Sequence, residues 1–361
     1  MKPILRSLSI CAFVCFTVLP QARADKIVLV AGDGTATDNA PATACRLNDP
    51  FGIAFDRSGT MFVVEMDLGQ RLLKVSTGGM LTVVGGNGQK GDAGDGGPVS
   101  RATFAGMHTL VAAPNDDLFL ADTWNNRIRR VSAKTGVITA FAGTGKKGFS
   151  GDGGPAIKAE FGSVINIALD PKGRNLYVVD IENRRVRVIN IASGLVKTVA
   201  GNGEKGVPAD GAVAAQSPLV DPRAVAVTAR GEIYILERSG HALRKVDEHG
   251  NIVTVAGTGK AGLSGDGGDA RLATMSGPKH VCLDRNGDVI FADTDNHVIR
   301  KYLPKENKIF RVAGTGKKGD GGVGGSPLEV ELNQPHGVTV GPDGLLYIAD
   351  SSNHRVLKIE R

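Results

Sequence analysis

A glycine-rich hexapeptide that returns about every 57 residues constrains the fold of this chain more than any other feature. The copies start at 57-, 58-, 56- and 57-residue intervals and read GNGQKG from Gly86, GTGKKG from Gly143, GNGEKG from Gly201, GTGKAG from Gly257 and GTGKKG from Gly314. A degenerate sixth copy, AGDGTATDNAPA, begins at Ala31. A lone G-x-G-x-x-G could form a loop that binds the phosphates of a nucleotide, but only where it follows a strand and opens a helix. Regular recurrence indicates a repeat architecture instead.

Each period has the same internal order of short apolar runs separated by turn residues. The second reads HTLVAA, DLFLADTWNNRIRRVS and GVITAFAG before its glycine-rich segment. These runs are rich in β-branched and aromatic residues and are bounded by Gly, Asn and Asp, which is typical of strands. Four strands per period predict one propeller blade each. The predicted blades begin near Asn48, Ala105, Gly162, Val220, Ser276 and Asn333.

The last period ends at Arg361 after three strands, without a fourth. The segment KIVLVAGDG, Lys26 to Gly34, matches the fourth strand and loop of the other periods, such as NIVTVAGTG. We therefore predict an all-β, six-bladed β-propeller with four antiparallel strands per blade. Its last blade is closed by the N-terminal strand, which removes the open sheet edges.

The first 24 residues have the layout of a secretory signal peptide. Basic Lys2 and Arg6 precede the apolar run LSICAFVCFTVL, and ARA ends at Ala24. We expect cleavage after Ala24, a secreted or periplasmic protein, and one propeller domain over residues 25–361. No other segment approaches the roughly 20 apolar residues of a membrane-spanning helix, so we expect no membrane insertion.

Charge and cysteine content exclude two further classes. Removing residues 1–24 takes away Lys2, Arg6 and Arg23 and lowers the formal net charge from +6 to +3. That balance gives no case for nucleic acid. Cys45 and Cys282 would be the cysteines left, which is not a disulfide framework, and whether they are bridged stays open at this point.

The final two periods resemble NHL repeats, with their P-x-G, Y-V-A-D and N-H-R pattern. The matching segments are GPKHVCLDRNGDVIFADTDNHVIRKY, Gly277 to Tyr302, and NQPHGVTVGPDGLLYIADSSNHRVLKI, Asn333 to Ile359. The resemblance implies the six-bladed propeller and covers residues 26–361. The GFSGDGGPA linkers also resemble those of extracellular NHL proteins, including teneurins. Such propellers include enzymes, RNA binders and adhesion modules, so fold alone does not set function.

Several polar patterns recur in every blade, and we interpret them as architectural because a binding site does not repeat six times. An acid follows each second strand and is expected to cap its turn and pair with a nearby Arg or His. The GDGGPA segments, which could suggest calcium loops, are expected to form Asx and glycine turns. The arginine-rich strands NNRIRRV and NRRVRVI are expected to present a solvated face. The recurring acids are Glu65, Asp122, Asp180, Glu237, Asp293 and Asp350.

The positions that break the repeat are the candidate site. The residue at the x of each P-x-G opens an inner strand and is expected at the mouth of the central channel, where ligands collect. Read around the ring, the six predicted ligand-binding residues are Phe51, His108, Ile165, Arg223, Lys279 and His336. We expect the two cations to bind a carboxylate, sulfate or phosphate, and the two apolar side chains to pack against an apolar part. The alternative is a solvated rim without a ligand.

Two enzyme families with similar propellers use this position. Peptidyl-hydroxyglycine amidating lyases bind zinc through histidines in PHG-like turns, and His108 and His336 match in alternate blades. The third corner holds Arg223, which cannot bind zinc, and His280 is expected to point to the other face. Senescence-marker type lactonases hold calcium or zinc through carboxylates and amides, which none of the six positions supplies. No cofactor is therefore predicted, and zinc or calcium is the alternative.

The sequence thus favours an exported, monomeric binding module for a protein, a glycan or a small anion. The second hypothesis is a lyase or hydrolase that uses His108 and His336 at the channel mouth. The third is a purely structural module. The identity of the ligand does not follow from the sequence.

Overall fold

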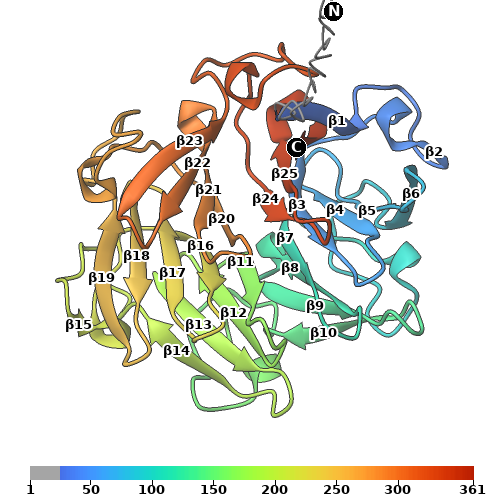
Figure 1. Cartoon of the computed structure of the whole chain (residues 1–361). Coiled ribbons are helices and arrows are strands. Elements are labelled where there is room, and N and C mark those ends of the chain that lie inside the picture. The colour runs from blue at the N-terminus through green and yellow to red at the C-terminus, as the bar shows by residue number, and fades with distance from the viewer. Residues whose placement is uncertain (1–24) are drawn as a thin grey trace, which may run out of the picture.

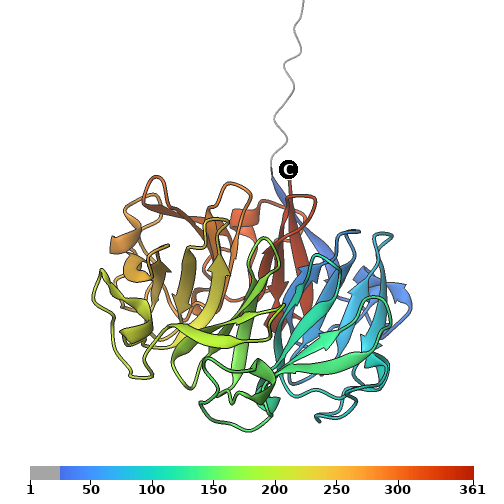
Figure 2. The same cartoon turned by 90° about the horizontal axis from the view of Figure 1, so that it is seen from below.

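Six antiparallel sheets stand around a central channel and form a closed ring (Figure 1). This computed structural model describes residues 25–361, and the predicted signal peptide, residues 1–24, lies outside the described residues. Seen from its side, the ring is a flattened disc (Figure 2). The predicted six-bladed β-propeller is confirmed, and the inner strand of each blade packs against the inner strands of its neighbours.

Within blades 1 to 5 the four main strands follow chain order from the channel to the rim, and in blade 6 the N-terminal β1 takes the outermost place. Blade 1 contains β3 (Pro50–Phe55), β4 (Met61–Glu65), β5 (Leu72–Val75) and β6 (Met80–Gly85), with the short β2 (Ala40–Pro41) on β6. Blade 2 contains β7 (Met107–Ala112), β8 (Leu118–Asp122), β9 (Arg127–Val131) and β10 (Ile138–Ala142). Blade 3 contains β11 (Val164–Leu169), β12 (Asn175–Asp180), β13 (Arg185–Asn190) and β14 (Val196–Ala200).

The remaining blades follow the same plan. Blade 4 contains β16 (Pro222–Val227), β17 (Ile233–Glu237), β18 (Ala242–Val246) and β19 (Asn251–Ala256), with the short β15 (Ala212–Val213) on β19. Blade 5 contains β20 (His280–Leu283), β21 (Val289–Asp293), β22 (Val298–Leu303) and β23 (Lys308–Ala313). Blade 6 contains β24 (Val338–Val340), β25 (Leu346–Asp350), β26 (Arg355–Glu360) and β1 (Lys26–Gly32).

The helices that the structure describes in residues 25–361 are single 3-10 turns. Six lie in the linkers between blades: η1 (Ala42–Ala44), η2 (Val99–Arg101), η4 (Ala156–Lys158), η5 (Ala214–Gln216), η6 (Ala270–Leu272) and η8 (Pro327–Glu329). Three follow second strands: η3 (Thr123–Asn125), η7 (Thr294–Asn296) and η9 (Ser351–Asn353). None of these turns has the length and hydropathy that a membrane-spanning helix needs.

The N-terminal strand completes blade 6, as the missing fourth strand predicted. β1 pairs antiparallel with β26, and Lys26 lies opposite Glu360. Ile27 is fully buried in the apolar cluster between blades 5 and 6. The strand therefore closes both the sheet and the ring.

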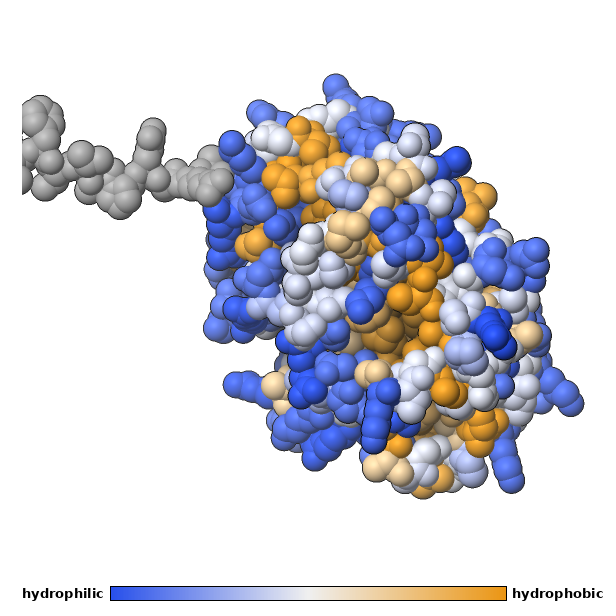
Figure 3. Space-filling model, turned by 90° about the vertical axis from the view of Figure 1, so that its right-hand side faces the viewer, coloured by the Kyte–Doolittle hydropathy of each residue, from blue (hydrophilic) through white to orange (hydrophobic). Residues whose placement is uncertain are grey.

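Apolar side chains fill the spaces between blades. Phe119 of blade 2 and Phe161 ahead of blade 3 belong to one buried cluster, and other clusters join the remaining blades in the same way. On the side of the ring seen in Figure 3 the surface is mostly hydrophilic, and hydrophobic residues gather in an oblique band within a depression. Cys45 and Cys282 are both free thiols, which settles the question of a bridge between them.

The six recurring acids are fully buried and structural. Asp122, for example, accepts the backbone N–H of Ala105 at 2.8 Å and the side-chain N–H of Asn125 at 2.9 Å. The amide that each acid accepts lies 17 or 18 residues upstream, ahead of the inner strand, rather than within the turn as expected. Burial raises the pKa of Asp180 and Asp293 to about 6.

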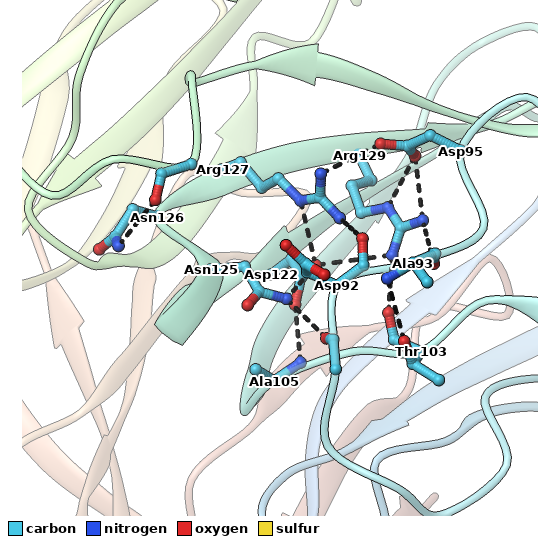
Figure 4. Close-up of polar contacts among 12 residues, drawn as sticks. Asp92, Ala93, Asp95, Thr103, Ala105, Asp122, Asn125, Asn126, Arg127 and Arg129 are labelled. Atoms are coloured by element: carbon cyan, nitrogen blue, oxygen red, sulfur yellow. Dashed lines mark hydrogen bonds and ion pairs between the residues drawn. The ribbon is translucent and has the colours of Figure 1, made fainter.

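The expected solvated face of the arginine-rich strands was wrong for the central arginines. Arg129 and Arg187 are fully buried, and each binds an aspartate of the linker that covers it. In Figure 4, Arg129 lies between Asp95 at 3.0 Å and Asp122 at 3.6 Å, and it also donates to the carbonyls of Ala93 and Thr103. A guanidinium tolerates burial only when its donors and charge are satisfied, and the linker supplies both.

Candidate functional site

The six sequence-predicted positions meet in one constriction of the channel, which we call the neck. Its walls enclose a cavity of about 10 Å³, lined by Phe51, His108, Thr109, Ile165, Asn166, Arg223, Lys279, His280 and His336. All six predicted residues are in this set, so their convergence is found. Their role in ligand binding stays a prediction.

Aromatic rings fill much of the neck. Phe51 stacks on His336 with ring centroids 3.9 Å apart and meets His108 edge-on at 5.2 Å. Phe51 is only 6% exposed and Ile165 only 4%. These two side chains therefore form the wall of the neck and leave little surface for the apolar part of a ligand.

Backbone contacts hold the two predicted histidines in one tautomer. Nδ1 of His108 donates to the carbonyl of Gly106 at 2.8 Å, and Nδ1 of His336 donates to the carbonyl of Gln334 at 3.0 Å, since a carbonyl can only accept. Burial and the nearby cations lower the pKa of both imidazoles well below 6.5. Both rings are therefore neutral at pH 7 and keep Nε2 unprotonated.

The structure adds three residues that sequence reasoning missed. His280 was expected to point away, yet it lines the neck together with Lys279. Its Nδ1 accepts the N–H of Val338 at 3.4 Å, so the neutral ring carries its hydrogen on Nε2. Thr109 and Asn166 complete the wall and bond to each other at 3.2 Å. All three lie one position after a predicted residue, and this adjacency in the sequence is the signal that could have identified them.

Two cations of the neck are poorly neutralised. Arg223 is 6% exposed, makes no ion pair among residues 25–361, and has an Nε without a hydrogen-bond partner. Burial, followed by repulsion from Arg238, lowers its pKa to about 9. Lys279 has one ion pair in the described chain, 3.6 Å to Asp295, whose side chain is 45% exposed.

Next to the neck, the turns of blades 2, 3 and 4 enclose a larger space, which we call the linker-face cavity. It measures about 440 Å³ and is lined by His108, Trp124, Ser163, Ile165, Ile181, Glu182, Arg184, Lys205, Val220, Asp221, Arg223, Arg238 and Ser239. The inner-strand residues His108, Ile165 and Arg223 border both spaces. Most of the other lining residues come from turns and linkers that differ between blades, which the repeat could not reveal.

The charges that line the linker-face cavity are unbalanced. Four cations face two acids, and both acids are already paired: Glu182 with Lys147 outside the cavity, and Asp221 with Arg238 at 2.8 Å. The other three cations make no ion pair in the described part of the chain. They are Arg184, Lys205 and Arg223. The cavity therefore carries uncompensated positive charge beside the apolar side chains of Trp124 and Ile181.

The other end of the channel differs in character. A cavity of about 590 Å³ there is lined mainly by aliphatic residues of the inner strands, including Ile53, Leu110, Ile167 and Val281. Cys282 lies in its wall, and burial raises the pKa of that thiol to about 12. The neck separates this apolar space from the cationic one.

Within residues 25–361, no three His, Cys, Asp or Glu side chains gather closely enough to hold a metal ion. The three imidazoles of the neck, His108, His280 and His336, therefore do not form such a group. The aspartates of the GDGG segments, which could have suggested calcium, bind buried arginines instead: Asp95, Asp152 and Asp266.

Comparison with known protein families matches parts of the chain to NHL sequences. The NHL repeat family matches residues 332–359, and the teneurin NHL domain family matches residues 156–264. NHL repeat-containing protein 2 of Gallus gallus is 31% identical over 189 residues, which cover 49% of this chain and 25% of that protein. The matched half of the chain thus corresponds to about a quarter of that relative's length.

Solved structures share the fold at low sequence identity. An auxiliary nutrient binding protein from Bacteroides thetaiotaomicron VPI-5482 superposes with a TM-score of 0.67 at 15% identity, covering 93% of this chain and 76% of that one. A streptogramin B lyase superposes with a TM-score of 0.56 at 13% identity, covering 93% and 98%. At these identities the likeness concerns the fold alone.

Proposed function

We propose that this chain, a member of the NHL-repeat family, is an exported binding propeller that captures a small organic anion in its linker-face cavity. Export rests on the signal-peptide layout of residues 1–24. Anion capture rests on one observation: Arg223 is buried at the border of a 440 Å³ cavity and has no acidic partner among the described residues.

The cavity supports an organic ligand rather than a bare ion. Its volume is within the range of small-molecule sites, about 300 to 1,000 Å³. A guanidinium binds a carboxylate through two parallel N–H donors, and such charge-assisted bonds gain strength where water is excluded. Trp124 and Ile181 offer an apolar or aromatic surface to the rest of the ligand. A compact carboxylate with an apolar body fits this combination.

The proposal can be tested by fluorescence, because Trp124 is the only tryptophan of the chain. We expect benzoate to change the Trp124 emission in a saturable way, and neutral benzamide to change it at least about tenfold more weakly. Loss of a charge-assisted hydrogen bond worth about 1.4 kcal/mol or more weakens binding at least about tenfold. Equal binding of benzoate and benzamide would contradict anion capture.

Substitution identifies the residue responsible. Arg223→Met should abolish the benzoate response. Arg230→Met is the matched control, because Arg230 is an exposed arginine of the same blade, in the turn between β16 and β17 at the other face. If both variants retain the benzoate response, Arg223 does not bind benzoate.

One observation favours an enzyme as the second candidate. His108 borders the linker-face cavity with an unprotonated Nε2, its Nδ1 hydrogen being donated to Gly106, so it could act as a general base at neutral pH. Turnover of a bound carboxylic ester or lactone that is lost in His108→Gln, with benzoate binding unchanged, would support this function. Binding without turnover supports the first.

A further inference from the structure

The neck is large enough for one small particle. Its volume of about 10 Å³ is close to the minimum that holds a single water-sized sphere. A carboxylate, sulfate or phosphate group has several heavy atoms and exceeds that space. Any occupant of the neck is therefore a water molecule or a monatomic ion.

The chemistry of the wall selects against a cation. None of the nine lining residues carries a carboxylate, and two are cationic side chains, Arg223 and Lys279. The hydrogen on His280 Nε2 adds a neutral donor to this wall. His108 and His336 donate their Nδ1 hydrogens to backbone carbonyls, and as neutral rings they add no charge to the neck.

The positive charge of the neck is compensated only in part: Lys279 pairs with Asp295 at 3.6 Å, whereas Arg223 makes no ion pair among the described residues. The nearby carboxylates, Asp221 and Asp295, do not line the neck. Asp221 pairs with Arg238, and Asp295 pairs with Lys279. Burying a guanidinium without a counter-charge costs free energy. Since little water reaches Arg223, an anion in the neck would offset that cost. A water molecule could accept a hydrogen bond but could not neutralise the charge.

We propose that the neck binds one halide ion, chloride in its natural setting, within reach of Arg223 and Lys279. The guanidinium has five N–H donors, so an ion in the neck leaves donors free for a ligand in the linker-face cavity. The halide thereby offsets the electrostatic cost of holding two cations, Arg223 and Lys279, close to each other in the channel.

Bromide is the probe, since it replaces chloride and scatters anomalously. Crystals soaked in sodium bromide should show an anomalous peak in the neck, within about 3.5 Å of the Arg223 or Lys279 nitrogens. In solution, 100 mM sodium bromide should raise Tm by about 3 °C over sodium nitrate at equal ionic strength, because nitrate has several heavy atoms, which makes it too large for the neck, and it is not an organic anion. A neck without an anomalous peak, or equal Tm values in the two salts, would overturn the proposal.

Variants locate the effect. Lys279→Met and Arg223→Met should each reduce the bromide-dependent rise in Tm by at least half, whereas Arg184→Met, which removes a cation from the linker-face cavity but not from the neck, should retain it. If Arg223→Met does not fold, Lys279→Met decides. A rise that only Arg184→Met abolishes would place the ion in the cavity and refute a neck site. The benzoate experiment is read separately, so either proposal can fail while the other stands.

Discussion

Asp152 in an exposed linker and Arg187 in a buried strand form an ion pair at 2.7 Å. The arginine side chain is fully buried, and the aspartate side chain is 35% exposed. Asp152 also accepts the backbone N–H and the hydroxyl of Thr198, at 3.1 and 2.6 Å. The linker is thus fastened to the blade that it covers, and the pairs Asp95–Arg129 and Asp266–Arg300 repeat the arrangement in two other blades.

We expect Asp152→Ala to lower the free energy of unfolding by about 2 kcal/mol, because it leaves a buried guanidinium with the more distant Asp180 as its remaining acidic partner. Chemical denaturation measures the change. Asp320→Ala is the control, since Asp320 is an exposed linker aspartate and its loss changes the net charge equally. A similar loss in both variants would show that linker charge, rather than this ion pair, matters.

Closure of the ring by β1 gives a second prediction. Ile27→Ala should cost about 3 kcal/mol, because Ile27 is fully buried between blades 5 and 6, whereas Lys26→Ala at the exposed neighbouring position should cost little. Deletion of Lys26 to Val30 should expose the edge of β26 and give aggregated or strongly destabilised protein. Thermal melting with light scattering tests both changes. An unchanged melting profile after the deletion would contradict closure.

The glycine that begins each linker gives a third prediction. Gly143 has φ of 91°, and an added Cβ would lie 2.5 Å from the carbonyl oxygen of Asn126. Gly143→Ala should therefore destabilise by about 2 kcal/mol or more, through both a strained φ and a steric clash. Gly136→Ala isolates the first cause, because Gly136 has φ of 67° and no neighbour within 4 Å of such a Cβ. Equal losses of stability in the two variants would exclude the clash.

The neck makes stability depend on pH. Burial, followed by repulsion from Arg223, lowers the pKa of His280 from 6.5 to about 4 in the folded state. Between those two values the unfolded chain binds more protons than the folded chain, so stability is full above pH 6.5 and falls as the pH drops toward 4. His108 and His336 act in the same direction. Buried Asp180 and Asp293 act oppositely, because their pKa is raised to about 6.

His280→Gln should remove its share of this slope, on the order of 2 kcal/mol between pH 7 and pH 4. Urea denaturation across that range measures it. His249→Gln, at an exposed position in the turn before β19, should keep the wild-type slope. If His280→Gln keeps it as well, the imidazole of His280 titrates normally in the fold.

The period of the sequence was sufficient to predict the blades, because each blade needs the same strands and turns. It also located the channel positions such as Arg223 and Lys279, since these alone vary where the repeat is strict. It did not predict the burial of Arg187, because alternation along a strand assigns a long charged side chain to solvent. The linker that returns over that side chain is a tertiary contact with no local signal.

The linker-face cavity escaped prediction for a similar reason. Trp124, Arg184 and Arg238 stand in turns of three different blades, and only the closed ring brings them together. His280 escaped because a strict two-residue alternation was assumed at the start of β20, where the backbone actually turns two successive side chains to the neck.

The pairing of Lys26 with Glu360 sets how this propeller can be tethered. Both ends of the described chain leave blade 6 together, whereas the other end of β1, at Gly32, leads into a glycine-rich linker. The two exits therefore lie away from the face that carries the cavity. A tag, a solid support or a neighbouring domain joined at either end would rest against the opposite side of the disc and leave the cavity open to solvent.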